Sequence, residues 1–226
     1  MRHHALPNKT VIVGAGGHAK VIIDILRADT HVELIGCLGQ HEGNKVMGLA
    51  VLGGDEQLPL LYAQGVRHAF IAVGNNERRR KLAGYAESIG YELVNAISPR
   101  AYIAANVTLG SGVAVMPGSV IQPDTTVGSY SIINTGATID HDGVIGEACH
   151  IAPGCTLSGN VSVGDLSFLG TGTKVIDGMR IGAGCMIGAG AVVIRHIPDH
   201  ALAVGVPAVV KRIQASIEPN VSRRET

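Results

Sequence analysis

The chain has 226 residues, of which 46% are hydrophobic, with 18 basic and 18 acidic side chains. This length and hydrophobic content suffice to bury one large core or two small ones, which excludes an intrinsically disordered protein. The balanced charge gives no basic field for nucleic acid, and only 3% of the residues are aromatic, so we expect no nucleic-acid partner.

Neither a membrane segment nor a secretion signal is visible in the sequence. No apolar run approaches the ~18 residues of a transmembrane helix, and the first residues have no long apolar core. We therefore expect a cytoplasmic protein with no membrane partner. The four cysteines, Cys37, Cys149, Cys155 and Cys185, show no C-x-x-C spacing. We expect them to be buried apolar filler, not disulfides or zinc ligands.

Residues 1–95 are predicted to form a small α/β domain. Short β-rich runs cover residues 10–13, 32–38, 68–73 and 91–94. Helical stretches run from the first glycine turn to residue 26 and over residues 55–64 and 77–89. Strands that alternate with helices predict a small parallel sheet with helices on its faces, a Rossmann-like arrangement.

From residue 96 onward the pattern changes to a six-residue repeat. Ile, Leu or Val recurs at every sixth position, at Ile97, Ile103, Leu109, Val115, Ile121, Val127, Ile133, Ile139, Ile145, Ile151, Leu157, Val163, Leu169, Val175, Ile181, Ile187 and Val193. The fourth residue after each is mostly small, as at Ala101, Ser119, Thr125, Ser131, Ala137, Gly143, Cys149, Cys155, Ser167, Thr173, Cys185 and Ala191. This period predicts a solenoid of short strands and tight turns, with one large and one small inward side chain per hexad. We assign residues 96–208 to the solenoid and residues 209–226 to a tail that begins with a short helix over 209–216.

The first turn of the α/β domain has the composition of a phosphate site. The segment Gly14-Ala15-Gly16-Gly17-His18-Ala19 matches G-x-G-x-x-A between a strand and a helix, where free backbone amides suit a pair of phosphates. An NAD enzyme would have an acidic residue at the end of the second strand, but Gly39 and Gln40 stand there, so NAD is disfavoured. A tight turn that binds nothing is the alternative.

Together these features resemble one family of bacterial sugar acyltransferases. The features that carry the resemblance are G-x-G-G-H-A-K at residues 14–20, Gly74-Asn75-Asn76 after the third strand, the hexad solenoid and Gly205-Val206-Pro207-Ala208. The resemblance implies a left-handed parallel β-helix, acetyl-CoA as co-substrate, no metal, and a homotrimer with active sites between subunits. Members acetylate nucleotide-linked 4-amino-4,6-dideoxy sugars, and related members act on sialic acid.

The resemblance also implies a nucleotide-sugar site in the N-terminal domain. Its residues correspond here to Gly14, Gly16, Gly17, His18, Gly39, Gln40, Gly74, Asn75, Asn76 and Arg79. Members specific for uridine often carry an Asp-Asp pair where this chain has Gly39 and Gln40. This difference favours GDP-perosamine slightly over a UDP-linked aminosugar.

His141 is the expected general base. The hexad register places His141 and His150 on outward positions, where a histidine is often only a solvated surface group. The stretch 134–142 is similar to the family segment that carries a catalytic histidine followed by an acidic residue. An imidazole with a pKa of about 6.5 suits the removal of a proton from an attacking amine. We expect Asp142 to support His141, with Asp140 as the alternative, because adjacency does not fix which carboxylate reaches the ring.

The resemblance further implies a path for acetyl-CoA along the outside of the later coils. It assigns His150 a place near the thioester, and the backbone N–H of Gly159 is our candidate donor to the oxyanion. The expected pantetheine track consists of Thr171, Gly172, Ala189 and Gly190. Glycine is also needed at the corners of the coils, so the track has a purely structural alternative. Lys211 and Arg212 are candidates for CoA phosphates, and a solvated terminus explains them equally well.

The predicted function is direct acetyl transfer from acetyl-CoA to the 4-amino group of a nucleotide-linked sugar. An O-acetyltransferase for a sialic acid hydroxyl would use the same histidine, and no residue distinguishes nitrogen from oxygen. A hexapeptide-prism carbonic anhydrase needs three histidines, and the hexads hold only two. A non-catalytic solenoid would leave the glycine turn and the His141-Asp142 pair unexplained.

Overall fold

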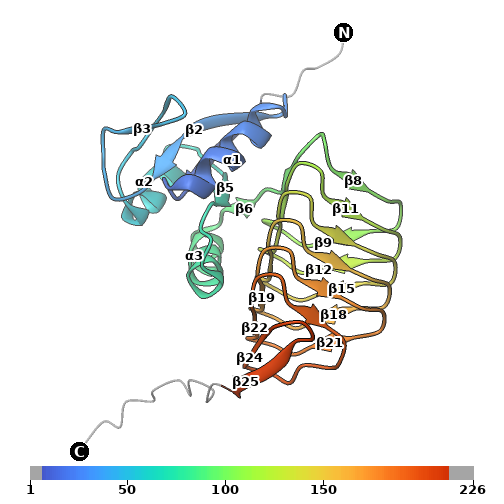
Figure 1. The fold of residues 1–226 in the computed structure, drawn as a ribbon. Coiled ribbons are helices and arrows are strands. Elements are labelled where there is room, and N and C mark those ends of the chain that lie inside the picture. Colours follow the sequence, from blue (N-terminus) through green and yellow to red (C-terminus); the bar gives the residue numbers. More distant parts are fainter. Residues whose placement is uncertain (1–6, 214–226) are drawn as a thin grey trace, which may run out of the picture.

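A computed structural model describes residues 7–213 and shows an α/β domain packed beside a triangular prism (Figure 1). The α/β domain has a four-stranded parallel sheet in the order β2-β1-β5-β6. Its elements are β1 (Asn8–Val13), α1 (Gly17–Arg27), β2 (Val32–Leu38), β3 (Lys45–Val46), β4 (Leu49–Ala50), the 3-10 turn η1 (Asp55–Gln57), α2 (Leu58–Ala63), β5 (His68–Ile71), α3 (Asn76–Ile89) and β6 (Glu92–Leu93). The expected parallel sheet is therefore confirmed.

Alternation along the central strand sorts the core onto two faces. Ile12 packs with α1, whereas Val11 and Val13 pack with α2 and α3 on the opposite face. Successive side chains of a strand point to opposite faces, so a strand covered on both sides must be apolar throughout. The β3–β4 hairpin was not predicted, because its strands have two residues each.

The prism is built mainly from two-residue strands. They stack into three faces, and within each face neighbouring strands run parallel, apart from β25. The first face contains β7 (Ala96–Ile97), β10 (Ala114–Val115), β13 (Ile132–Ile133), β16 (His150–Ile151), β19 (Phe168–Leu169), β22 (Met186–Ile187), β24 (Ala201–Val204) and the antiparallel β25 (Val209–Ile213). The second face contains β8 (Tyr102–Ile103), β11 (Val120–Ile121), β14 (Thr138–Ile139), β17 (Thr156–Leu157), β20 (Lys174–Val175) and β23 (Val192–Val193). The third face contains β9 (Thr108–Leu109), β12 (Thr126–Val127), β15 (Val144–Ile145), β18 (Ser162–Val163) and β21 (Arg180–Ile181).

The hexad register predicted the interior of the prism. Its aliphatic positions are buried from Val115 to Val193, whereas Ile97 at the open end is 41% exposed. The small positions are buried as well, and their hydroxyls donate to carbonyls inside the coils, as from Ser167 to Gly182 O at 2.7 Å. All four cysteines are free and buried, which confirms them as filler.

The end of the prism differs from the expectation of a helical tail. The predicted helix over 209–216 is wrong for residues 209–213, which form β25 antiparallel to β24, and residues 214–216 lie outside the described residues. Gly205, at a φ of +100°, begins the turn that reverses the chain. The reversed chain then meets the free edge of β24, where pairing satisfies backbone groups that a helix would leave open.

The α/β domain sits on the outer surface of the first face. Outward residues Ala96, Ala114 and Ile132 share one apolar cluster with α1. The next outward position along this row is His150, so the domain boundary runs directly past a predicted site residue. Among the described helices, none has the length and apolar character needed to cross a bilayer.

Candidate active site

A cavity of about 550 Å³ lies at the carboxyl end of the parallel sheet. Seven predicted residues line it, namely Gly14, Gly16, Gly17, His18, Gly39, Gln40 and Gly74. Lining residues that the sequence did not single out are His41, Asn44, Lys45, Asp55 and Arg78. Most of these come from the unpredicted hairpin and from helix starts, so no motif marked them.

Two glycines allow the backbone around this cavity to pack closely. A Cβ on Gly14, which has a φ of +124°, would lie 2.5 Å from the carbonyl oxygen of Ala72. A Cβ on Gly39 would lie 2.6 Å from the Cβ of Ala15. Helix α1 has no side-chain cap at Gly16, so its first backbone amides face the cavity and suit an anionic group.

A second cavity of about 970 Å³ lies between α3 and the prism. Gly74, Asn75 and Asn76 line it, together with Phe168 and Met186 of the first face. The Asn75 side chain caps α3 by accepting from the Arg78 N–H at 2.9 Å. The predicted nucleotide-sugar residues are therefore divided between two cavities that meet at Gly74.

Arg79 does not line either cavity, so its prediction as a ligand of the substrate disagrees with the structure. Its side chain is 1% exposed, and its nitrogens donate to protein oxygens on both sides of the domain boundary. The physical reason is that α3 packs its first turn on the corner that joins the third face to the first, and this buries the guanidinium. We call this corner the α3 corner; it includes residues 128–131, 146–149 and 164–167.

His141 lies on a different corner, which joins the second face to the third and includes residues 140–143, 158–161 and 176–179. The His141 Nδ1 and the Asp142 Oδ2 are 2.7 Å apart, and both side chains are 54% exposed. A carboxylate only accepts, so Nδ1 carries the proton and the Nε2 lone pair of the neutral ring is free. Asp140 instead accepts from the His141 backbone N–H at 2.9 Å. Of the two carboxylates considered, Asp142 is the one that reaches the ring.

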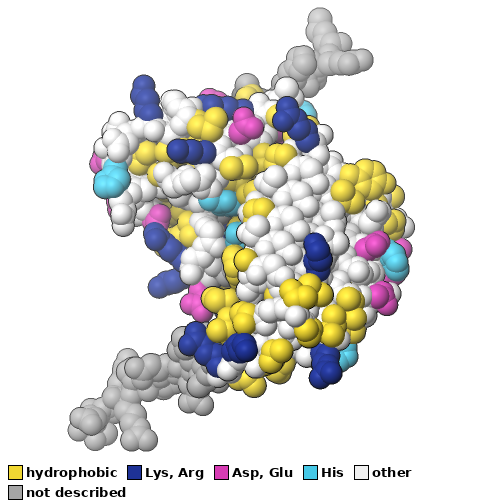
Figure 2. Space-filling view, in the orientation of Figure 1, with side chains coloured by type: hydrophobic (Ala, Val, Ile, Leu, Met, Phe, Trp, Pro, Cys, Tyr) yellow, Lys and Arg dark blue, Asp and Glu magenta, His cyan; other side chains and the backbone are white. Residues whose placement is uncertain are grey.

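Acidic neighbours favour the protonated form of His141. The hydrogen bond to Asp142 is the largest cause that raises its pKa above the ordinary value, desolvation opposes it, and the charges of Asp140 and Asp177 raise the pKa further. Figure 2 shows acidic side chains on both sides of a histidine at the right-hand edge of the prism. Asp177 was not predicted, although it lies two coils of 18 residues beyond His141 and the repeat could have identified it.

Gly159 forms the floor beneath the His141 ring. A Cβ at this position would lie 2.6 Å from the His141 Cε1 and 2.8 Å from the Nε2. Within residues 7–213, no backbone or side-chain acceptor takes the Gly159 N–H. The glycine therefore leaves both space for the ring and an unused donor close to it.

His150 points out of the prism as predicted, but the solvated alternative is wrong. Its Nε2 lies 3.0 Å from the Asn134 amide nitrogen, and its ring meets Phe168 edge to face with centroids 5.1 Å apart. Burial, and secondarily the Arg79 charge, lower the pKa of His150 to about 4. Its buried Nδ1 has no hydrogen-bond partner among the described residues.

The predicted pantetheine residues lie on the remaining corner of the prism, which joins the first face to the second. We call it the glycine corner, after Gly154, Gly172 and Gly190, which all have positive φ. Thr171, Gly172, Ala189 and Gly190 stack on neighbouring coils, with the Gly190 N–H donating to Thr171 O at 2.8 Å. A Cβ on Gly172 or Gly190 would meet nothing within 4 Å, so the backbone is open on this side.

Comparisons with known proteins agree with this two-part architecture. The family model described as the PglD N-terminal domain matches residues 9–86, and the model for bacterial transferase hexapeptide repeats matches residues 106–141. A perosamine N-acetyltransferase variant from Caulobacter crescentus, solved with CoA and GDP-perosamine, is 46% identical with a TM-score of 0.88. The match covers 90% of this chain and 97% of that chain. The chain belongs to the hexapeptide-repeat nucleotide-sugar acetyltransferases.

Further similar structures come from the same family. The acetyltransferase domain of PglB from Neisseria gonorrhoeae is 34% identical, with a TM-score of 0.86 over 90% of this chain and 99% of that one. WeeI from Acinetobacter baumannii is 25% identical, with a TM-score of 0.80 over 89% of this chain and 98% of that one. The curated protein L142 of Acanthamoeba polyphaga mimivirus is 32% identical over 102 residues, and the chain spans only 20% of its length.

Membership in this family settles two expectations. The prism is a left-handed β-helix of hexapeptide repeats, and the protein is an acyltransferase. The family resemblance inferred from the sequence is confirmed.

Proposed function

We propose that the protein transfers an acetyl group from acetyl-CoA to the 4-amino group of a nucleotide-linked 4-amino-4,6-dideoxy sugar. The observation that carries this proposal is the His141–Asp142 pair, 2.7 Å apart on an exposed corner of an acyltransferase prism. Support for the substrate class comes from the Caulobacter crescentus enzyme, whose structure holds CoA and GDP-perosamine.

The nucleotide diphosphate binds in the 550 Å³ cavity of the N-terminal domain, residues 1–95. The uncapped start of α1 holds the phosphates. The contact of Gly39 with Ala15 leaves no room for an aspartate at position 39, which supports a GDP-linked sugar such as GDP-perosamine over a UDP-linked one.

The reaction is a direct displacement at the acetyl carbonyl. The amine nitrogen forms a bond to the carbonyl carbon while His141 Nε2 takes the amine proton, and the C–S bond then breaks to release the CoA thiolate. The carboxylate of Asp142 stabilises the imidazolium that forms. The Gly159 N–H, unused within residues 7–213, donates to the oxyanion of the tetrahedral intermediate.

Acetyl-CoA lies along the glycine corner in residues 96–208, against Thr171, Gly172, Ala189 and Gly190. Open backbone at these positions supports a close approach of the pantetheine arm. We assign His150, on strand β16 directly before this corner, to the thioester end.

The complete site needs more than one copy of the chain. His141 lies on the corner opposite the first face, whereas the N-terminal domain covers the first face and the α3 corner. We therefore propose a cytoplasmic homotrimer in which His141 of one subunit faces the nucleotide sugar held by another. The product enters a surface polysaccharide or glycan pathway.

The first experiment follows CoA thiol release with GDP-perosamine and, separately, with a UDP-linked 4-amino-4,6-dideoxy sugar. Turnover with one sugar identifies the nucleotide and supports the amine acceptor. If neither sugar reacts while acetyl-CoA still binds, the amine proposal is wrong and a sialic acid hydroxyl becomes the acceptor to test.

A further inference from the structure

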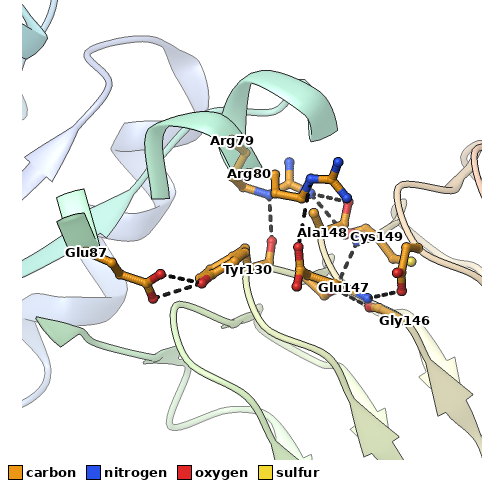
Figure 3. A network of polar contacts seen from close by, with 10 residues as sticks. Arg79, Arg80, Glu87, Tyr130, Gly146, Glu147, Ala148 and Cys149 are labelled. Carbon is orange, nitrogen blue, oxygen red and sulfur yellow. Dashed lines mark hydrogen bonds and ion pairs between the residues drawn. The ribbon is translucent and has the colours of Figure 1, made fainter. Parts of the chain in front are cut away.

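The guanidinium of Arg79 is a buried cation surrounded by neutral oxygen atoms. It donates six hydrogen bonds, three to the prism and three within the α/β domain, and Figure 3 shows part of this network. Within residues 7–213, no carboxylate lies within ion-pair distance of it. A buried charge without a counter-ion is costly unless every donor is satisfied, so this site is built around the arginine.

The partners of Arg79 belong to two places that the reaction must bring together. Nη1 donates to Val73 O at 3.0 Å and to Gly74 O at 3.1 Å, in the turn shared by both cavities. Nη2 donates to Ala148 O at 3.0 Å and to Cys149 O at 3.1 Å, directly before His150. One planar group thus fixes the distance between the turn and the strand β16.

Two further hydrogen bonds fix the orientation of the guanidinium plane. Nε donates to Tyr130 O at 2.6 Å, one coil away from Ala148, and Nη2 also donates to Asn76 Oδ1 at 2.8 Å. Asn76 in turn donates to Leu166 O and Ser167 O. Three successive coils of the α3 corner are therefore held by two neighbouring side chains of α3.

We propose that Arg79 is a positioning residue that ties strand β16 to the Gly74 turn and so sets the His150 ring against that turn, without touching the substrate. This assignment rests on the proposed function for its catalytic consequence. The groups that face His150 support it: Arg79 comes from α3, His18 from α1, and the Gly74 carbonyl from the turn. Burial first, and the Arg79 charge second, lower the pKa of both His18 and His150 to about 4.

Two substitutions distinguish the effect of the Arg79 positive charge from the effect of its planar set of hydrogen-bond donors. Arg79→Lys keeps the cation but has no planar fork of donors, so His150 stays neutral while kcat/KM for the nucleotide sugar falls at least about tenfold. Arg79→Gln removes the cation as well as the fork, so the pKa of His150 rises by the part that the Arg79 charge contributes, which is smaller than the part from burial, and kcat/KM falls at least as far. The matched control is Arg67→Gln, because Arg67 is an exposed arginine that lines neither cavity and lies over the Tyr62 ring, 4.1 Å from its centroid.

The measurements are steady-state kinetics and a histidine NMR titration without substrate, with the His150 signal identified by its loss in His150→Asn. The proposal is wrong if His150 in folded Arg79→Gln titrates as in Arg67→Gln, or if kcat/KM in both Arg79 variants stays within about twofold of that control. If both Arg79 variants fail to fold, Asn76→Ala, which removes one acceptor of the guanidinium, must shift the His150 ring signals of the substrate-free protein for the proposal to stand. If no sugar is turned over, the proposed function fails, and the titration alone decides whether Arg79 controls His150.

Discussion

The corner that carries His141 and the junction that contains His150 place the same side chain in opposite surroundings. The His141 ring is exposed and faces Asp142, Asp140 and Asp177, which raise its pKa. The His150 ring is packed under the N-terminal domain, next to a cation, and its pKa is about 4. An imidazole near carboxylates is a stronger base, whereas a buried imidazole near a cation remains a neutral hydrogen-bonding group.

In the proposed reaction, this difference separates two roles. Proton removal requires a ring that can take up a charge, and the exposed corner permits it. The proposal assigns His150 to the thioester end, where its low pKa keeps the ring neutral near pH 7. Each of the following experiments alters one side of this contrast.

The largest effect is expected for His141→Asn. Loss of the proposed general base should lower kcat by about 10²–10⁴-fold, while GDP binding stays unchanged because His141 is assigned to the sugar amine and not to the nucleotide. Calorimetric titration with GDP and the CoA thiol assay measure the two quantities, with His31→Asn on an exposed loop as the control. A kcat within tenfold of wild type would show that another group removes the proton.

Gly159→Ala should have the next largest effect. The added Cβ would lie 2.6 Å from the His141 Cε1, so the ring must move, and a displacement of this size costs about 10²-fold in kcat. Gly84→Ala on α3 is the control, because its Cβ meets nothing within 4 Å and alanine favours the helix. Equal activity of the two variants would mean that the His141 position is not critical.

Asp142→Asn should change the pH profile as well as the rate. Neutral His141 is the active form, so kcat/KM rises as the pH exceeds its pKa. Loss of the carboxylate removes the main cause that raises this pKa. The acidic limb should therefore move to lower pH, and the plateau should fall about tenfold because the imidazolium is less stable. If the acidic limb of the kcat/KM profile does not move, the group that titrates there is not His141.

The last expected effect is on stability, not on activity, and comes from the junction. Both His18 and His150 have folded pKa values of about 4, below the ordinary 6.5. The unfolded chain therefore binds more protons between these values, so the free energy of unfolding falls as the pH drops from about 6.5 toward 4, by at most about 1.4 kcal/mol per pKa unit and group. Urea unfolding at pH 7.5 and 5.0 measures this loss. It should shrink in His150→Asn and persist in His31→Asn.

The sequence predicted the features that come from the hexad repeat or from neighbouring residues in the chain. The hexads predicted the prism interior down to Cys149, and adjacency predicted the pair of His141 and Asp142. It did not predict the junction, because the burial of Arg79 and His150 depends on α3 packing against coils some 50 to 90 residues away. The strand β25 was missed for a similar reason, since its partner is the edge of β24 and not a local pattern.

That terminal strand has a consequence for assembly. A stack of identical coils ends in unpaired backbone, to which the first coil of another molecule can add without limit. Here β25 folds back in the antiparallel direction on β24 and occupies that edge. It also brings the exposed charges of Lys211 and Arg212 to the rim. A second copy therefore cannot continue the first face by adding a parallel strand to β24.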